Sequence, residues 1–301
     1  MFEWYQMSGF LNKQKSMVLA VVTVIFSVFL HSCGKSDTDG DAEVLKINGS
    51  TTVNLPIAEA AEELRSERGM VIQVDTQGGS SGGISMLGEV LVHIGMASKP
   101  ITDGDRAKFP ECDFHEIHVG EDAVALVVSQ DVWNGGVKAV SREEMQAIYE
   151  RRITNWKDLG GPDQRIAFFN KEPGRGTWEV FAKWAYGSAK SAPAVSFPEV
   201  GGNEETRSKV ATTRGALSQL SSSWVDGKSV FALALKDADG VAVEPSLENI
   251  VSSAYPMRRP LFLLSNGEPK GLAKEFVDYV LSKRGQELIR KHSYLALEDL
   301  Y

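Results

Sequence analysis

Three short segments rich in glycine and hydroxyl residues have the composition of an anion-binding site. They are residues 49–52, 79–82 and 174–177, and each lies between a run typical of a strand and a run typical of a helix. The first turn of a helix has unpaired backbone N–H groups and the positive end of the helix dipole. Glycine allows close backbone approach, and hydroxyl groups add donors. Three such turns that converge could surround one tetrahedral oxyanion.

Each turn also has a simpler interpretation. Serine and threonine are the usual N-cap residues of helices, and glycine is the usual residue of tight turns. A single turn of this kind is therefore explained by capping alone. The recurrence of the pattern three times, each time after an apolar strand, favours the anion-binding interpretation.

The elements that position these turns alternate along the chain. The apolar spacing of residues 56–68 and 271–284 predicts helices, and Ser141 to Glu144 form a capping box that opens another. Thr177 precedes a further amphipathic helix. This alternation predicts an α/β fold with mainly parallel sheets. Its predicted strands are residues 44–47, 71–74, 93–97, 123–128, 166–169 and 261–264.

Composition restricts the classes of function. The 301-residue chain has a net charge of −8 and a pI of about 5.3, which argues against a nucleic-acid partner. An anion must then be held by local dipoles, because the overall charge repels it. The two cysteines, Cys33 and Cys112, form no metal-binding motif, and no GxxxxGK[ST] loop occurs. We therefore expect no metal and no cofactor.

The first 42 residues are typical of an export signal and a tether. Lys13 and Lys15 precede an apolar run over residues 17–30, which is short for a membrane span. The segment that follows the run, up to Cys33, resembles a bacterial lipobox. Residues 1–33 are thus a predicted lipoprotein signal segment, with lipidation at Cys33, and residues 34–42 a flexible tether. An uncleaved N-terminal anchor is the alternative.

An ordered set of motifs resembles the phosphate-binding proteins of bacterial phosphate ABC importers. The set covers nearly everything after Lys46. Its motifs are Gly-Ser-Thr-Thr-Val (49–53), Gly-Gly-Ser-Ser-Gly-Gly-Ile (78–84), Ile-Gly-Met-Ala-Ser-Lys (94–99), Ile-Thr-Asn-Trp (153–156) and Pro-Gly-Arg-Gly-Thr (173–177), followed by the stretch over residues 245–271.

The resemblance implies a type II periplasmic-binding-protein fold. Two α/β lobes would enclose a ligand cleft, joined by two hinge crossovers near residues 121–122 and 254–257. Residues 43–121 with 257–301 would form lobe 1, and residues 122–256 lobe 2. The chain would be no enzyme: it would bind inorganic phosphate outside the cytoplasm, as a lipid-anchored monomer, and deliver it to ABC permease membrane subunits.

Several ligand contacts follow from the matched motif positions. Asp122 would accept the proton that phosphate keeps near neutral pH, which sulfate lacks. An ordinary solvated loop acid is the alternative for Asp122. The other expected contacts are Thr51, Thr52, Ser80, Ser98, Lys99, Gly176 and Thr177, with Ser50 from the first turn.

Two positions depart from the family pattern at the third turn. Lys171 stands where relatives have arginine, and a lysine cannot donate to two oxygens as a planar guanidinium does. Arg175 replaces a serine and could supply that guanidinium from another direction, or could crowd the site. Both residues belong to the predicted ligand-binding set.

Three alternatives remain open at this stage. The same fold could bind another oxyanion, such as sulfate or molybdate, or it could act as a sensor. Residues 78–82 also fit the Gly-x-Ser-x-Gly pattern of a serine hydrolase, with Ser80 as nucleophile and His292 as a distant base. The hydrolase is disfavoured, since only one or two predicted strands precede Ser80.

Overall fold

The computed structural model describes residues 43–300, which form one compact unit from Val44 onward. The predicted signal segment with Cys33 and the tether lie outside the described residues. Within the described part, no helix has the length and apolar character needed to cross a bilayer.

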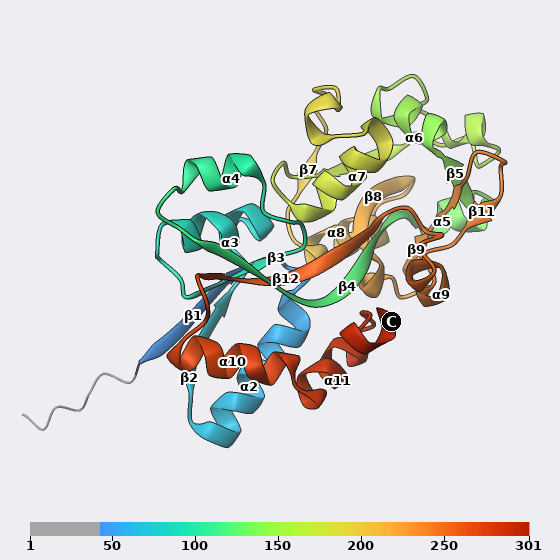
Figure 1. Cartoon of the computed structure of the whole chain (residues 1–301). Coiled ribbons are helices and arrows are strands. Elements are labelled where there is room, and N and C mark those ends of the chain that lie inside the picture. The colour runs from blue at the N-terminus through green and yellow to red at the C-terminus, as the bar shows by residue number, and fades with distance from the viewer. Residues whose placement is uncertain (1–42, 301) are drawn as a thin grey trace, which may run out of the picture. The chain divides into compact units, whose positions relative to one another are not determined.

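One nine-stranded sheet runs through the unit (Figure 1). A separate three-stranded sheet is formed by β5 (Ala139–Ser141), β10 (Ala234–Lys236) and β11 (Ala242–Val243). In the large sheet, β9 (Val230–Ala232) pairs with β4 beside the main path. That path follows the order β2 (Val71–Asp75), β1 (Val44–Gly49), β3 (Ile94–Ala97), β12 (Arg258–Asn266), β4 (Phe114–Ser129), β8 (Ala216–Ser221), β6 (Ala167–Lys171) and β7 (Glu199–Val200).

The strand directions correct the expectation of mainly parallel sheets. β1 is parallel to β2 and β3, and β6 is parallel to β7 and β8. The long strands β4 and β12 are antiparallel to each other, and they are also antiparallel to β8 and β3, respectively. The sheet is therefore mixed, because the chain passes along β4 in one direction and returns along β12 in the other.

The helices largely follow the sequence pattern. Ser141 and Glu144 form the predicted capping box. The helix expected over residues 271–284 is instead two helices, because Ser282 has an extended backbone and its hydroxyl accepts from the N–H of Gly285. The α-helices are α2 (Asn54–Arg68), α3 (Gly79–Gly88), α4 (Asp103–Lys108), α5 (Gln130–Asn134), α6 (Arg142–Tyr149), α7 (Gly176–Tyr186), α8 (Asn203–Thr212), α9 (Leu247–Val251), α10 (Gly271–Leu281) and α11 (Lys283–Lys291).

Two large hydrophobic clusters lie along this sheet. The first packs α2, α10 and α11 against β1, with Ile57, Leu64 and Phe276 fully buried. The second surrounds Trp156 and Phe181. Its members come from residues 123–257, together with Leu295 near the C-terminal end. The clusters divide the chain close to the predicted lobe boundaries, although the boundaries themselves stay a prediction.

The sharp turn after β1 depends on a glycine. Gly49 has φ +145°, and a Cβ atom there would lie 2.1 Å from the carbonyl oxygen of Met96. We therefore expect Gly49→Ala to lower the free energy of unfolding by about 3 kcal/mol or more. Gly69→Ala is the matched control, since Gly69 also has positive φ but has open space around it, and should cost only about 1 kcal/mol. Urea unfolding measures both, and equal midpoints would contradict the steric argument.

Candidate functional site

The three glycine- and hydroxyl-rich turns meet around one small cavity. Its volume is about 10 Å³, roughly the room that one water molecule needs. Nine of the eleven predicted ligand-binding residues line it, and Gly79 and Gly201 complete the lining. The nine are Ser50, Thr51, Thr52, Ser80, Ser98, Lys171, Arg175, Gly176 and Thr177.

The N-terminal ends of α2, α3 and α7 belong to these turns, and none of them has a side-chain cap. By contrast, α4 and α6 each have a complete capping box. The missing cap is not distinctive by itself, since α10 also lacks one. What sets the three helices apart is that their first turns, or the residues just before them, line the same cavity. The capping interpretation from the sequence therefore does not account for their hydroxyl residues.

Glycine is required where the start of α7 meets the second turn and the segment that follows β3. A Cβ atom on Gly176 would lie 2.4 Å from the Ser98 hydroxyl oxygen and 2.9 Å from that of Ser80. A Cβ atom on Gly79 would lie 2.7 Å from Cδ of Arg175. The backbone of one turn thus reaches the hydroxyl groups of the next, which a larger residue would prevent.

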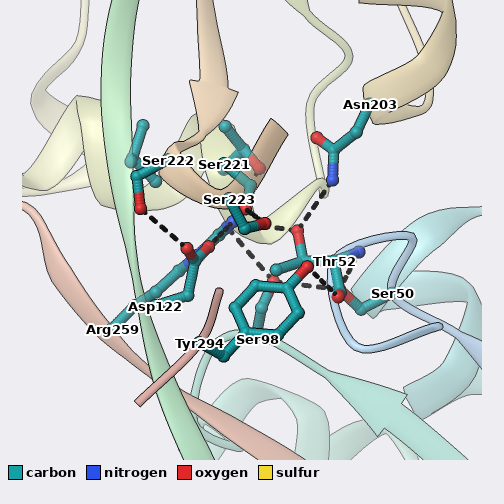
Figure 2. A network of polar contacts seen from close by, with 12 residues as sticks. Ser50, Thr52, Ser98, Asp122, Asn203, Ser221, Ser222, Ser223, Arg259 and Tyr294 are labelled. Atoms are coloured by element: carbon teal, nitrogen blue, oxygen red, sulfur yellow. Dashed lines mark hydrogen bonds and ion pairs between the residues drawn. The ribbon is translucent and has the colours of Figure 1, made fainter. Parts of the chain in front are cut away.

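A fully buried arginine contacts three residues of the cavity lining and uses all five of its N–H groups. Figure 2 shows it together with Asp122, Thr52 and Ser98. Arg259 donates from Nε and Nη2 to Oδ2 of Asp122, at 3.0 and 2.7 Å. Its remaining donors reach the hydroxyl oxygens of Ser98 (3.2 Å), Thr177 (2.9 Å) and Thr52 (2.9 Å). Since a guanidinium has five N–H groups, Arg259 has none left for a ligand.

This arrangement orients the hydroxyl groups that line the cavity. Oγ1 of Thr52 accepts from Arg259 and also from Nδ2 of Asn203, at 3.1 Å. A hydroxyl that accepts two hydrogen bonds has its own hydrogen free to donate elsewhere. Ser98 also accepts from Arg259 and from the hydroxyl of Ser50, and it shares a hydrogen bond of 3.3 Å with the hydroxyl of Ser80. The cavity therefore presents donors, which suits an anion.

The charges around the cavity are also of one sign. Lys171 and Arg175 contribute to its lining, whereas no aspartate or glutamate does. Arg175 pairs with Glu172 outside the lining, at 2.7 Å, and its guanidinium is mostly buried. In a chain of net charge −8, the charged residues that line this cavity are therefore all basic.

Comparisons with known proteins agree with this geometry. A model of the PBP superfamily domain matches residues 36–284. The phosphate-binding protein PstS of Bacillus subtilis is 30% identical, over 96% of each chain. The chain belongs to the phosphate-binding protein family of the PBP superfamily.

Two solved structures of this family support the fold. A substrate-binding protein of a phosphate ABC transporter from Clostridium perfringens, with bound phosphate, matches with a TM-score of 0.75 at 28% identity. The match covers 85% of this chain and 100% of that one. An ABC-type phosphate transport receptor from Vibrio cholerae matches with a TM-score of 0.65 at 29% identity, covering 83% and 99%. The predicted periplasmic-binding-protein fold is confirmed.

Two residues that the family resemblance placed at the ligand do not line the cavity. Asp122 is fully buried, and its two oxygens are engaged by Arg259 and by the hydroxyl of Ser222. Lys99 points to Glu179 of α7, with Nζ 2.6 Å from Oε1. A direct contact of either residue with a ligand stays a prediction, and here both instead form ion pairs.

Lys171 is held by oxygen atoms of the protein next to the cavity. Its ammonium nitrogen is buried and lies 2.9 and 3.0 Å from the carbonyl oxygens of Gly201 and Gly202. It also donates to the hydroxyl of Thr206. Burial lowers the pKa of Lys171 well below its usual value, and the nearby Arg175 and Arg259 lower this pKa further. Lys171 thus holds the segment before α8 while it lines the cavity.

Neither Arg259 nor Asn203 was predicted as a site residue from the sequence. Arg259 lies in β12, next to Arg258 and before Pro260, within a run of mostly buried apolar residues. A charged residue inside a buried strand is a signal that it has a partner. Asn203 gave no comparable signal, because it stands at the start of a mostly polar helix.

The serine-hydrolase alternative fails on geometry and on family. The hydroxyl of Ser80 accepts from the N–H of Ser98 and lies 3.3 Å from the Ser98 hydroxyl. His292 is instead bonded to Glu59, between α11 and α2. The family consists of transport binding proteins and not of enzymes.

Removal of the central arginine should be costly. Arg259→Met leaves the carboxylate of Asp122 buried without a counter-charge, and we expect a loss of about 3–5 kcal/mol in the free energy of unfolding. The pair of Arg284 with Glu63 provides the control, since Arg284 is exposed and Arg284→Met should cost far less than Arg259→Met. Adding Asp122→Asn to Arg259→Met should recover part of the loss, as a double-mutant cycle would show. Equal costs for the two arginine variants would refute this role.

The depressed pKa of Lys171 predicts a pH effect on stability. The unfolded chain keeps a lysine proton up to a pKa of about 10.4, whereas the folded protein releases it at lower pH. Stability should therefore rise with pH between the folded and unfolded pKa values. Lys171→Met removes this contribution, so its unfolding free energy should rise less than that of the wild type in alkaline solution. Urea unfolding at a series of pH values measures this difference, with the exposed Lys228→Met as control. Parallel curves of unfolding free energy against pH for the wild type and Lys171→Met would contradict the lowered pKa of Lys171.

Proposed function

We propose that this chain binds inorganic phosphate in the cavity between the three turns and delivers it to an ABC permease. The observation that supports this most is the lining of the cavity, which combines helix N-termini, donor hydroxyls and two cationic side chains without a carboxylate. The relative from B. subtilis is named for phosphate binding, and that from C. perfringens holds phosphate. A charged, hydrogen-bonded oxyanion fits such a lining.

Binding requires the cavity to open and close again. Its volume is too small for a tetrahedral oxyanion as it stands. Several contacts join the predicted lobes beside it. They include the hydrogen bond of the Ser81 hydroxyl to the carbonyl of Gly174, the Lys99–Glu179 ion pair, the Asn203–Thr52 hydrogen bond and the Arg259–Thr177 hydrogen bond. We infer that these contacts break on ligand entry and form again around the ligand.

The cellular setting is part of the same proposal. A lipid anchor at Cys33, after cleavage of the signal segment, would hold a monomer at the outer face of the membrane beside its permease. The tether over residues 34–42 would give the folded unit reach. The sequence pattern and the family support this, and mass spectrometry of the membrane-bound protein would detect the acyl groups.

One observation favours a second candidate ligand. A protein rejects sulfate when a carboxylate in the site would face it without a shared proton. Here no carboxylate lines the cavity, and Asp122 is occupied by Arg259. Sulfate is therefore the alternative ligand.

Calorimetric titration of ligand-stripped protein, residues 43–301, with phosphate and separately with sulfate tests the function. We expect one phosphate per chain with clear release or uptake of heat. If the protein binds sulfate but not phosphate, the proposed ligand is wrong and sulfate takes its place in the proposal. Binding of neither anion would overturn the proposal.

The donor role of Thr177 can be tested in the same titration. Thr177→Val keeps the shape of the side chain but removes a hydroxyl at the cavity, which accepts from Arg259. A hydrogen bond to a charged group contributes about 1.5–3 kcal/mol, so phosphate should bind at least about tenfold more weakly. Thr212→Val, at the exposed end of α8, is the control and should bind as the wild type does. Unchanged affinity in Thr177→Val would exclude that hydroxyl as a ligand donor.

A further inference from the structure

A second and larger cavity lies along β6, next to the C-terminal end of α6. Its volume is about 460 Å³, within the range of pockets that accept drug-sized molecules. It shares no residue with the lining of the oxyanion cavity. It is therefore a separate candidate site.

The body of this second cavity is apolar. Phe168 and Phe197 form its aromatic side, with ring centroids 4.7 Å apart in an edge-to-face arrangement. The ring of Phe197 is further held by Tyr149 and by the guanidinium of Arg151. Its other apolar lining residues are Ile148, Ile153, Ile166, Ala167, Phe169 and Pro198.

An incomplete sheet edge accounts for the space. β8 pairs with Ala167 to Phe169 on one side of β6. On the other side β7 pairs only with Asn170 and Lys171. The first half of β6 therefore has no strand beside it on that edge, and the cavity occupies this position.

The charged residues of this cavity are all cationic. Arg151, Arg165 and Arg214 belong to the lining, which contains no aspartate or glutamate. Among residues 43–300, no carboxylate lies within 4 Å of the Arg151 or Arg165 guanidinium. The guanidinium of Arg214 has one acidic neighbour in the same range, Asp131, with Nε 4.0 Å from Oδ2. Arg151 donates to the carbonyl of Ser196, which leaves other N–H groups for a ligand.

We propose that this second cavity binds an amphipathic organic anion, with an aromatic or aliphatic body against the phenylalanines and a carboxylate on the arginines. Charge complementarity selects this class, because three guanidinium groups border an apolar space and two of them, those of Arg151 and Arg165, have no acidic partner among residues 43–300. A guanidinium binds a carboxylate through two parallel hydrogen bonds. A neutral apolar molecule would leave the arginines unused.

Calorimetric titration with 4-phenylbutanoate tests the proposal, with 4-phenylbutan-1-ol as the neutral comparison. We expect one phenylbutanoate per chain, with a dissociation constant on the order of 1 mM or lower, and much weaker binding of the alcohol. Saturating phosphate should not displace it. Displacement by phosphate, equal binding of the alcohol, or no binding would each overturn the proposal.

A double variant identifies the cavity. Arg151→Gln with Arg165→Gln should weaken phenylbutanoate binding about tenfold or more. Arg152→Gln is the matched control, since Arg152 follows Arg151 directly, is exposed and is not in the lining. Both proteins should bind phosphate as the wild type does, which shows that they are folded and separates this test from that of the proposed function. Unchanged phenylbutanoate binding in the double variant would place the ligand elsewhere and refute the site.

Discussion

The site depends on one guanidinium group whose donors are all engaged. Arg259 is buried, is neutralised by Asp122 and donates to hydroxyls from three separate parts of the chain. A buried charge is unfavourable unless it is paired and fully hydrogen-bonded, and this one meets both conditions. The same bonds that satisfy the arginine decide which atoms face the cavity. Its role is thus indirect: it fixes the direction of donors that it does not itself supply.

This arrangement explains how an acidic protein can hold an anion. A net charge of −8 repels an anion at long range, and screening by salt limits that repulsion to about 10 Å. Inside the cavity the fixed groups are helix N-termini, hydroxyl hydrogens, Lys171 and Arg175. Short-range directed dipoles therefore dominate over the net charge, because they are held in place before the ligand arrives.

Local patterns in the sequence predicted much of the fold and of the site. The three turns could be recognised because glycine and hydroxyl residues at a strand–helix boundary form a local signal. The partners of Arg259 and Lys99 could not, because Asp122 and Glu179 lie 137 and 80 residues away from them. Strand direction also escaped prediction, since an apolar run is the same whichever way β4 or β12 runs. Lys171 lines the cavity, but its bonds to Gly201 and Gly202 depend on a loop with no sequence signal of its own.

The course of β4 and β12 has a mechanical consequence. Arg259 and Asp122 are directly paired residues of these two strands, at the place where the sheet passes from one hydrophobic cluster to the other. Any rotation of one half against the other must twist this two-stranded ribbon, and atoms close to the axis of a rotation move least. Arg259 and Asp122 would then stay nearly in place during the rotation, while the turn at Gly176 would move farther. Part of the binding surface would keep its shape throughout the cycle, so that only the outer part needs to be rebuilt each time the protein closes.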